Sequence, residues 1–272
     1  MKIGIFDSGY GGFTILEKIV EILPQYDYVY LGDNARTPYG TRSFEVVYAC
    51  TLQCVKKLFE MDCQIVILAC NTASAKALRT IQQTDLQRIA PNRRVLGVIR
   101  PTVEKIDEMT ETKVVGLFGT SGTIQSKSYE MEIAKLFPNI NVVSEACPMW
   151  VPLIENNEHE KEGADYFVKQ HIYNLLAKKT AIDAVILGCT HYPLLLEKIK
   201  KYLPENIKII TQGMLVADSL KNYLFRHPEH ETLCTKNSTV DFFTTESVEK
   251  FEASASIFLN KNIAAKRLVL TL

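Results

Sequence analysis

Two segments of this sequence end in the same way: an apolar run, a small residue, a cysteine, and then hydroxyl or amide side chains. The first covers residues 65–72 and contains Cys70, and the second covers residues 184–191 and contains Cys189. Each apolar run is typical of a buried strand, and ligands of α/β proteins bind at the carboxyl ends of strands. Two thiols at equivalent strand ends would face one ligand. That arrangement suits a reaction that removes a proton from one face of a carbon and delivers a proton to the other face.

The alternative for each cysteine is an unreactive side chain in the core, because free cysteine packs as a small hydrophobe. The recurrence of the pattern favours a functional role for both. Each cysteine is expected at the start of a helix, where the pKa of a thiol is lowered. Pro193 suits the first turn of the second helix. His191, two residues after Cys189, could tune that thiol or bind a substrate carboxylate.

A second pair of landmarks extends the repeat. Residues 2–9 resemble residues 113–121, so that Gly4 matches Gly116 at a separation of 112 positions. The two cysteines are separated by a similar 119 positions. A period of this length excludes a solenoid. We therefore expect two homologous lobes, each of which contributes one cysteine.

Strand-like and helix-like segments alternate along the chain, which predicts an α/β fold with mostly parallel sheets flanked by helices. The expected strands are residues 2–6, 27–31, 64–69, 94–98, 113–118, 140–144, 182–187, 207–210, 239–243 and 266–270. The expected helices are residues 12–22, 42–60, 73–89, 102–109, 123–136, 160–177, 193–202, 214–225 and 246–257. We predict two pseudo-symmetric lobes with the active site in the cleft between them. Lobe one is residues 1–97 with a C-terminal return over residues 210–272, and lobe two is residues 98–209. Residues 226–238 are expected to form a solvated loop.

Composition limits the class of protein. The 272 residues suffice for one large or two medium domains. The 31 basic and 31 acidic residues cancel and form no long basic stripe, which argues against a nucleic-acid partner. No apolar run approaches the ~18 residues that span a bilayer, and the first strand begins too early to leave room for a signal peptide. Seven cysteines without a CxxC pair fit the reducing cytoplasm.

Cys50 and Cys54 are four residues apart and would share one face of a helix, with Cys63 nearby. A metal site is conceivable there, but no histidine lies close in the sequence. Ordinary packing is the favoured interpretation.

Two polar loops follow the first two expected strands. The glycine-rich loop Asp7–Gly12 would let a ligand approach backbone N–H groups, and the helix start after it favours an anion. It lacks the dinucleotide spacing and the Walker lysine, so a plain strand-to-helix turn is the alternative. In the second loop, Pro38 and Gly40 shape a turn that could present Tyr39 and backbone amides, whereas Arg36 could be a surface residue.

Four ordered motifs resemble those of the glutamate racemases, which belong to the cofactor-independent amino-acid racemase superfamily. These motifs are Phe6–Gly12, Gly32–Gly40, Ala69–Ser74 and Leu187–Pro193, and Gly97–Pro101 and Val151–Glu155 also look like family segments. The resemblance covers about residues 2–200, with weaker similarity beyond. It implies an isomerase that interconverts L- and D-glutamate and supplies D-glutamate for peptidoglycan synthesis. It also implies cytoplasmic action without pyridoxal phosphate, another cofactor or a metal. The implied partner is the glutamate substrate, with no nucleic acid and no membrane, and a homodimer is allowed.

The resemblance further implies the roles of single residues. Cys70 and Cys189 transfer the protons, with Asp7 assisting Cys70 and His191 assisting Cys189. The two assisting side chains also bind the substrate, together with Ser8, Tyr39, Gly40, Asn71, Thr72, Thr190 and, near the second cysteine, Glu155.

Three other interpretations are open. The first is a racemase of another acidic amino acid such as aspartate, although the related aspartate racemases tend to carry Glu where this chain has His191. The second is an amino-acid sensor with inert cysteines. The third is a thiol-redox protein, which would need a Cα separation of ~4.4–6.8 Å between the cysteines, whereas a substrate between them would hold them further apart.

Two C-terminal segments depart from the family pattern, Ile210–Gly213 and Thr244–Ser247. They are far in sequence from the cysteines, so they do not bear on the expected reaction. They leave lobe packing, regulation and oligomer geometry open.

Overall fold

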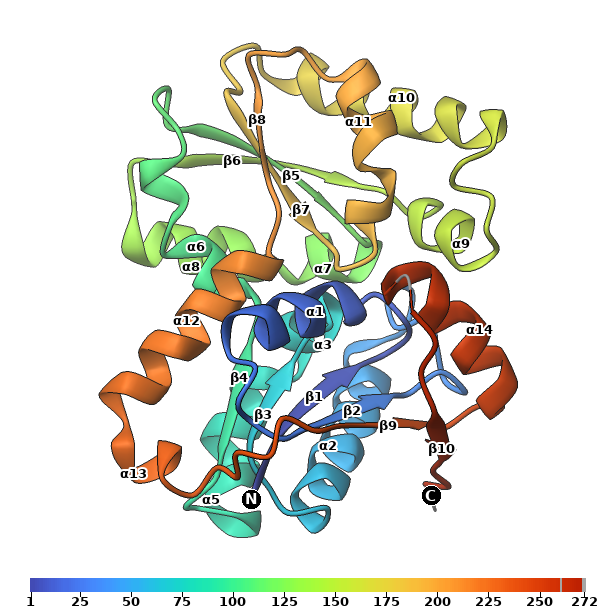
Figure 1. The fold of residues 1–272 in the computed structure, drawn as a ribbon. Helices are drawn as coiled ribbons and strands as arrows, with labels where there is room; N and C mark the ends of the chain where they lie inside the picture. The colour runs from blue at the N-terminus through green and yellow to red at the C-terminus, as the bar shows by residue number, and fades with distance from the viewer. Residues whose placement is uncertain (260, 271–272) are drawn as a thin grey trace.

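Two separate parallel sheets, one in each lobe, form the framework of residues 1–259 and 261–270, the part of the chain that the computed structural model describes (Figure 1). The larger sheet has the strand order β10-β9-β2-β1-β3-β4, and the smaller sheet has the order β6-β5-β7-β8. The strands are β1 Lys2–Asp7, β2 Tyr28–Gly32, β3 Cys63–Leu68, β4 Arg94–Gly97, β5 Val114–Gly119, β6 Asn141–Ala146, β7 Ala184–Gly188, β8 Lys208–Ile210, β9 Val240–Thr244 and β10 Ala265–Arg267. All the expected strands are present, and each starts within two residues of its predicted start.

The pairing registers explain the repeat in the sequence. Gly4 on β1 pairs with Val66 on β3, and Gly116 on β5 pairs with Val185 on β7. Four residues after these valines the chain reaches the two cysteines of the repeat, each just past the end of its strand. The strand orders β2-β1-β3-β4 and β6-β5-β7-β8 are the same in the two lobes. The cysteines therefore occupy equivalent positions, and the predicted α/β fold with two pseudo-symmetric lobes is confirmed.

Helices cover both faces of each sheet, because successive strand side chains point to opposite faces. The longer helices are α1 Phe13–Ile22, α2 Phe44–Glu60, α8 Ser128–Leu136, α10 Glu162–Lys178, α12 Gly213–Arg226 and α14 Val248–Leu259. The shorter helices are α3 Asn71–Lys76, α4 Leu78–Thr80, α5 Leu86–Ile89, α6 Ile99–Val103, α7 Ser121–Ser126, α9 Trp150–Glu155, α11 Leu196–Tyr202 and α13 Pro228–Glu231, with single turns η1 Ile81–Asp85, η2 Ile106–Glu108 and η3 Tyr192–Leu195.

Each lobe has two apolar cores, one on each face of its sheet. In lobe one, Ile3 and Ile5 of β1 pack with α1, α12 and α14, whereas Phe6 packs with α2 and α3 on the opposite face. In lobe two, Phe118 of β5 packs with α9, α10 and α11, and Leu117 packs with α6 and α8. Both sheets are thus buried on both faces, which leaves the carboxyl ends of the strands for the site.

The chain crosses between the lobes twice. The first crossing leads from β4 into α6 at Val98, and the return leads from β8 into α12 at Gln212. Helix α12 then packs against α1, and β9 and β10 extend the larger sheet beyond β2. The C-terminal segment therefore lies with lobe one, and the stretch that leads into β9 passes the N-terminus, where Thr235 N donates to Met1 O (Figure 1). The lobe boundaries at residues 97 and 209 stay a prediction.

Three differences from the expected elements stand out. The expected helix 73–89 begins earlier, at Asn71, and is broken into α3, α4, η1 and α5. The short helix α9 was not expected from the sequence. The prediction of a solvated loop over residues 226–238 is right for most of these residues, which are exposed, but the segment also contains α13, and both His230 and Cys234 are buried. His230 Nδ1 lies 3.1 Å from Gln64 Nε2. The polar composition of the segment therefore gave no sign that His230 and Cys234 face inward.

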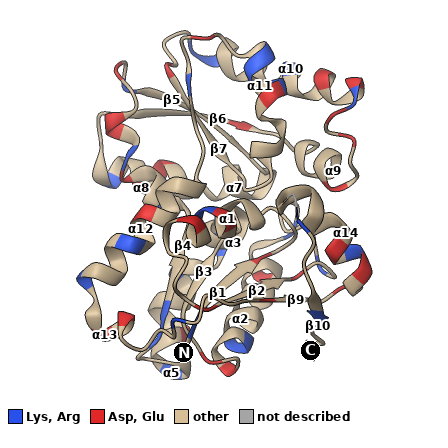
Figure 2. Cartoon of the chain, in the orientation of Figure 1, with Lys and Arg blue, Asp and Glu red and all other residues tan. Residues whose placement is uncertain are grey.

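Lys and Arg are interspersed with Asp and Glu over the outer helices of both lobes (Figure 2). In the described part of the chain, no helix is both long and apolar enough to cross a membrane.

Candidate active site

A cavity of about 60 Å³ lies where the carboxyl ends of the central strands of both lobes meet. Ten of the predicted site residues line it: Asp7, Ser8, Tyr39, Gly40, Cys70, Asn71, Thr72, Cys189, Thr190 and His191. They come from the ends of β1, β3 and β7 and from the loop after β2. The cavity therefore has the position at which ligands bind in parallel α/β sheets.

Cys70 lies between β3 and α3 and caps that helix. Its Sγ accepts a hydrogen bond from the Ala73 N–H at 3.4 Å and lies 3.3 Å from Ser8 Oγ. The expectation that the helix start lowers the pKa of this thiol is wrong. Burial, together with the nearby charge of Asp7, raises the pKa of Cys70 to about 12 and outweighs the two hydrogen bonds. Cys70 is therefore a neutral thiol at neutral pH.

Asp7 is buried at the end of β1 with one oxygen free. Oδ2 accepts a hydrogen bond from the Gly9 N–H at 2.9 Å, whereas Oδ1 is buried without a hydrogen-bond partner among the described residues. Burial raises the pKa of this carboxyl, and the positive charge of His191 partly opposes that rise. The free oxygen is thus available to a thiol or to an ammonium group in the cavity.

Cys189, His191 and Glu155 form a chain of polar contacts in lobe two. Cys189 Sγ lies 3.8 Å from His191 Nδ1, and His191 Nε2 lies 3.1 Å from Glu155 Oε1. Burial alone would lower the pKa of His191, but the hydrogen bonds to Cys189 and Glu155 and their charges raise it to about 10. His191 is therefore an imidazolium at neutral pH, with one N–H toward each neighbour. Glu155 does not line the cavity. It contacts His191 at Nε2, the ring nitrogen that does not face Cys189.

The loop after β2 is fixed by a buried carboxylate, Asp33. Arg36 Nε donates to both Asp33 oxygens, at 2.9 and 2.7 Å, and the Tyr39 hydroxyl donates to Asp33 Oδ2. Arg36 is therefore no plain surface residue. The engaged hydroxyl leaves the Tyr39 ring as its contribution to the cavity wall. Gly40 O accepts a hydrogen bond from Gly122 N at 2.7 Å, which joins this loop to lobe two.

Sequence reasoning missed part of the cavity wall. The further lining residues are Thr37, Pro38, Thr41, Thr120, Ser121, Pro148, Val151 and Pro152. Thr120 follows β5 as Ser8 follows β1, so the internal repeat carried the signal that could have identified it. Thr120 Oγ1 lies 2.9 Å from Thr72 Oγ1, which closes one side of the cavity across the two lobes.

From the sequence, a metal site at Cys50, Cys54 and Cys63 is conceivable, with ordinary packing favoured. Among the residues that the structure describes, no group of three or more His, Cys, Asp or Glu side chains could hold a metal ion. Cys50, Cys54 and Cys63 are buried in the core between β3 and α2.

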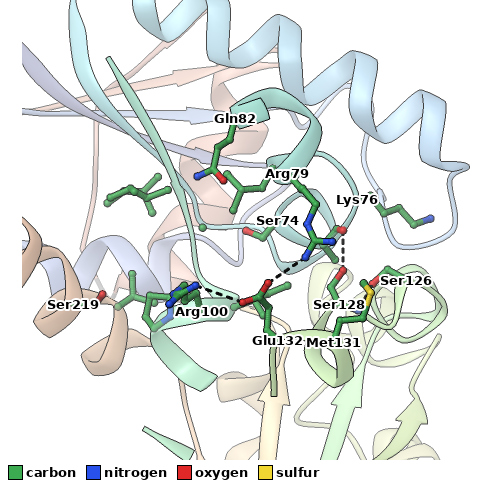
Figure 3. A pocket seen from close by; sticks show the side chains of 18 of the residues that line it. Ser74, Lys76, Arg79, Gln82, Arg100, Ser126, Ser128, Met131, Glu132 and Ser219 are labelled. Atoms are coloured by element: carbon green, nitrogen blue, oxygen red, sulfur yellow. Dashed lines mark hydrogen bonds and ion pairs between the residues drawn. The ribbon is translucent and has the colours of Figure 1, made fainter. Parts of the chain in front are cut away.

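A larger cavity of about 1040 Å³ lies on the other side of α3 (Figure 3). Ser74 and Lys76 line it, whereas Asn71 and Thr72 of the same helix line the smaller one. Arg79 and Arg100 both point toward Glu132 there, with N–O distances of 3.2 and 3.8 Å (Figure 3). None of the predicted site residues lines this larger cavity.

The sequence matches the profile of the Asp/Glu/Hydantoin racemase family over residues 3–218. Among curated proteins, the glutamate racemase of Ruegeria sp. (strain TM1040) is 38% identical, over 97% of this chain and 98% of the relative.

Solved structures agree with the sequence comparison. The glutamate racemase isoform RacE1 of Bacillus anthracis superposes with a TM-score of 0.89 at 36% identity, over 99% of this chain and 97% of that one. The glutamate racemase of Francisella tularensis in complex with D-glutamate has a TM-score of 0.86 at 33% identity, over the same two shares.

Proposed function

Because the chain belongs to the Asp/Glu/hydantoin racemase family, we propose that it interconverts L- and D-glutamate by proton transfer between Cys70 and Cys189. Its activity is that of an amino-acid racemase, an isomerase. The proposal of two acting cysteines rests on one observation: both thiols line the same cavity from equivalent strand ends. Inversion of a carbon through a carbanion needs an acceptor on one face and a donor on the other, and this arrangement supplies both.

The two thiols start in different states in this proposal. We assign the resting thiolate to Cys189, whose Sγ lies 3.8 Å from His191 Nδ1, whereas burial and Asp7 keep Cys70 protonated. The Cys189 thiolate removes the α-proton of L-glutamate and becomes a thiol. The Cys70 thiol then gives its proton to the opposite face of the carbanion and becomes a thiolate. D-glutamate follows the same two steps in reverse.

The carbanion needs electrostatic stabilisation, because an α-proton next to a carboxylate and an ammonium is a very weak acid. Fixed donors aimed at the α-carboxylate supply such stabilisation in a cavity with little water. We assign this role to Ser8, Asn71, Thr72 and Thr190, whose polar groups line the cavity. The free Oδ1 of Asp7 is suited to the substrate ammonium or to the thiol of Cys70.

The wider setting of the reaction is part of the same proposal. We place the enzyme in the cytoplasm, where reducing conditions keep its seven unpaired cysteines as thiols. There it would supply D-glutamate for peptidoglycan synthesis, in a reaction that needs no cofactor. A homodimer is compatible with this proposal.

The test is to incubate the purified protein with L-glutamate, without added cofactor, and to follow optical rotation. We expect the signal to fall to zero and, in deuterated water, deuterium to enter the α-position. Aspartate is the matched control, because it differs by one methylene; that difference discriminates by about 10–200-fold. Equal rates on aspartate would contradict the substrate assignment, and loss of activity on chelation would contradict metal-free chemistry.

A further inference from the structure

We propose that Gln212, at the return crossing between the lobes, is a positioning residue that orients the side-chain amide of Asn71 toward the substrate. Gln212 is buried, with only 3% of its surface exposed, and precedes α12. It belongs to the segment that departs from the family pattern and that the sequence placed far from the cysteines. In the structure it touches the residue that follows Cys70 directly.

Gln212 forms a closed ring of hydrogen bonds with two other side chains, Asn71 and Tyr129. Asn71 Nδ2 donates to Gln212 Oε1 at 2.6 Å. Gln212 Nε2 donates to the Tyr129 hydroxyl at 2.8 Å. The Tyr129 hydroxyl donates to Asn71 Oδ1 at 2.7 Å. Each donor therefore meets an acceptor. The opposite direction would turn Gln212 Oε1 toward Val98 O, a carbonyl that can only accept and that lies 3.3 Å from Gln212 Nε2, so the ring has one direction.

This direction fixes the orientation of the Asn71 amide. Because Gln212 Nε2 faces Val98 O, it also donates to the Tyr129 hydroxyl. Tyr129 then gives its single proton to Asn71, so the Asn71 oxygen faces Tyr129. One N–H of the Asn71 amide is then used by Gln212, and the second N–H is left over. Asn71 lines the small cavity, so this second N–H is the group that a substrate oxygen would accept from. A flipped amide would present an oxygen to the substrate carboxylate and would repel it.

Gln212 also connects the two crossings. Its second Nε2 proton goes to Thr102 Oγ1 at 2.9 Å, on the outgoing crossing. Thr102 Oγ1 in turn donates to Val98 O at 2.9 Å. One buried amide thus joins the return crossing, the outgoing crossing, α8 of lobe two and the site residue of α3. The orientation of Asn71 therefore depends on the relative position of the lobes.

The experiment compares Gln212→Met and Tyr129→Phe with the wild type; it rests on the proposed function, because it uses glutamate. Both variants keep the shape of the side chain and remove its hydrogen bonds to the ring. We expect each to raise KM for L-glutamate, and Kd for D-glutamate by calorimetry, by roughly tenfold, with kcat changed much less. In an Asn71→Ala background, Gln212→Met should raise KM no further, because both act through one amide.

Gln64→Met is the matched control. Gln64 is another buried glutamine whose Nε2 donates to a backbone oxygen, Asn92 O at 2.8 Å, but it lies away from the cavity. We expect a lower Tm with unchanged KM. An equal rise in KM for Gln64→Met and Gln212→Met, or unchanged KM and Kd for both Tyr129→Phe and Gln212→Met, would overturn the assignment.

A readout without substrate separates this inference from the proposed function. Hydrogen exchange of α3 and α6 should accelerate together in Gln212→Met and not in Gln64→Met. Unchanged exchange in both helices contradicts the network, whereas a wild type that does not racemise glutamate contradicts only the proposed function.

Discussion

Cys70 and Cys189 are identical side chains in different electrostatic surroundings. Cys70 has a buried carboxyl, Asp7, as its neighbour, whereas Cys189 contacts the imidazolium of His191. The site thus combines a neutral thiol beside a carboxyl on one side with a thiol beside a positive charge on the other. Sequence reasoning predicted both pairings but not the raised pKa of Cys70, because desolvation depends on atoms brought together from across the chain.

Replacing one cysteine should leave half of the reaction. Cys70→Ser should lose racemisation by several orders of magnitude, because a serine hydroxyl is too weak an acid to serve as donor or resting base. It should still exchange the α-hydrogen of L-glutamate slowly in deuterated water, through Cys189. Cys189→Ser should show the mirror preference for D-glutamate. NMR of the α-proton measures both exchanges, and full racemisation by either variant would rule out two-base catalysis.

Glu155→Gln should lower the pKa of His191, because a hydrogen bond and a negative charge from Glu155 raise it. Activity that needs the imidazolium falls as pH rises through the pKa, which is about 10 in the wild type. In the variant, the alkaline limb of kcat/KM should begin about one pH unit lower. An unmoved limb would show that the charge of His191 is not required.

The same raised pKa has a consequence for stability. The stabilisation from charging His191 in the folded state is fully present below its unfolded pKa of about 6.5, and it is lost as pH rises toward 10. The free energy of unfolding, measured with urea, should therefore fall less between pH 6 and pH 10 for Glu155→Gln than for the wild type. Equal losses would contradict the shift.

At the scale of elements, the close approach of the loop before α1 to the start of η3 decides the geometry of His191. A Cβ on Gly11 would overlap His191 Nδ1 and lie 2.6 Å from Thr190 Oγ1. His191 cannot retreat easily, because Glu155 holds its other nitrogen. Gly11→Ala should therefore lower kcat/KM by about 100-fold, the effect of roughly a 1 Å displacement of a catalytic group.

Gly163→Ala is the control for that change. Gly163 lies in the first turn of α10, and a Cβ there would meet nothing within 4 Å. The variant should be more stable by about 0.5–1 kcal/mol with unchanged activity, since alanine favours helix over glycine. Wild-type activity in Gly11→Ala would contradict the role of this contact.

Alternating strands and helices made the elements predictable, since strand ends such as Cys70 and Cys189 follow from local patterns. The breaks in the helix after Cys70 could not be predicted in this way. The π-turn Ile81–Asp85 packs Ile81 into the core that contains Val95 of β4, and a local sequence pattern does not report such a long-range contact. The contact between Gln212 and Asn71 was also beyond prediction. It joins residues 141 positions apart, and no repeat or motif relates them.

At the scale of the whole molecule, one carboxylate anchors the C-terminal segment to lobe one. Asp27, at the start of β2, accepts hydrogen bonds from Asn237 Nδ2 at 2.6 Å and from Thr239 Oγ1 at 2.7 Å, and from both backbone N–H groups. Burial alone would raise the pKa of Asp27, but these hydrogen bonds hold it well below its usual range. They set the register of β9 beside β2.

Asp27→Asn should lower the free energy of unfolding by about 3 kcal/mol at pH 7, since hydrogen bonds to a charged group are the strong ones. A lowered folded pKa gives stabilisation that is present above the unfolded pKa, near 3.9, and is lost as pH falls below it. The difference between wild type and variant in urea unfolding should therefore shrink at pH 3. A constant difference would contradict an ionised Asp27 as the anchor.

Asp7 beside Cys70 and His191 beside Cys189 are chemically different, although the two lobes are similar, and this difference has a consequence for the kinetics. Two enantiomers have the same free energy in water, so the equilibrium constant of the reaction is one. The ratio of kcat/KM for the two directions must equal that constant, however different the surroundings of the two thiols are. The difference between Asp7 and His191 can thus change the concentration at which each enantiomer saturates the enzyme and the speed at saturation, but only in proportion. If one enantiomer has a lower KM, its kcat is necessarily lower by the same factor.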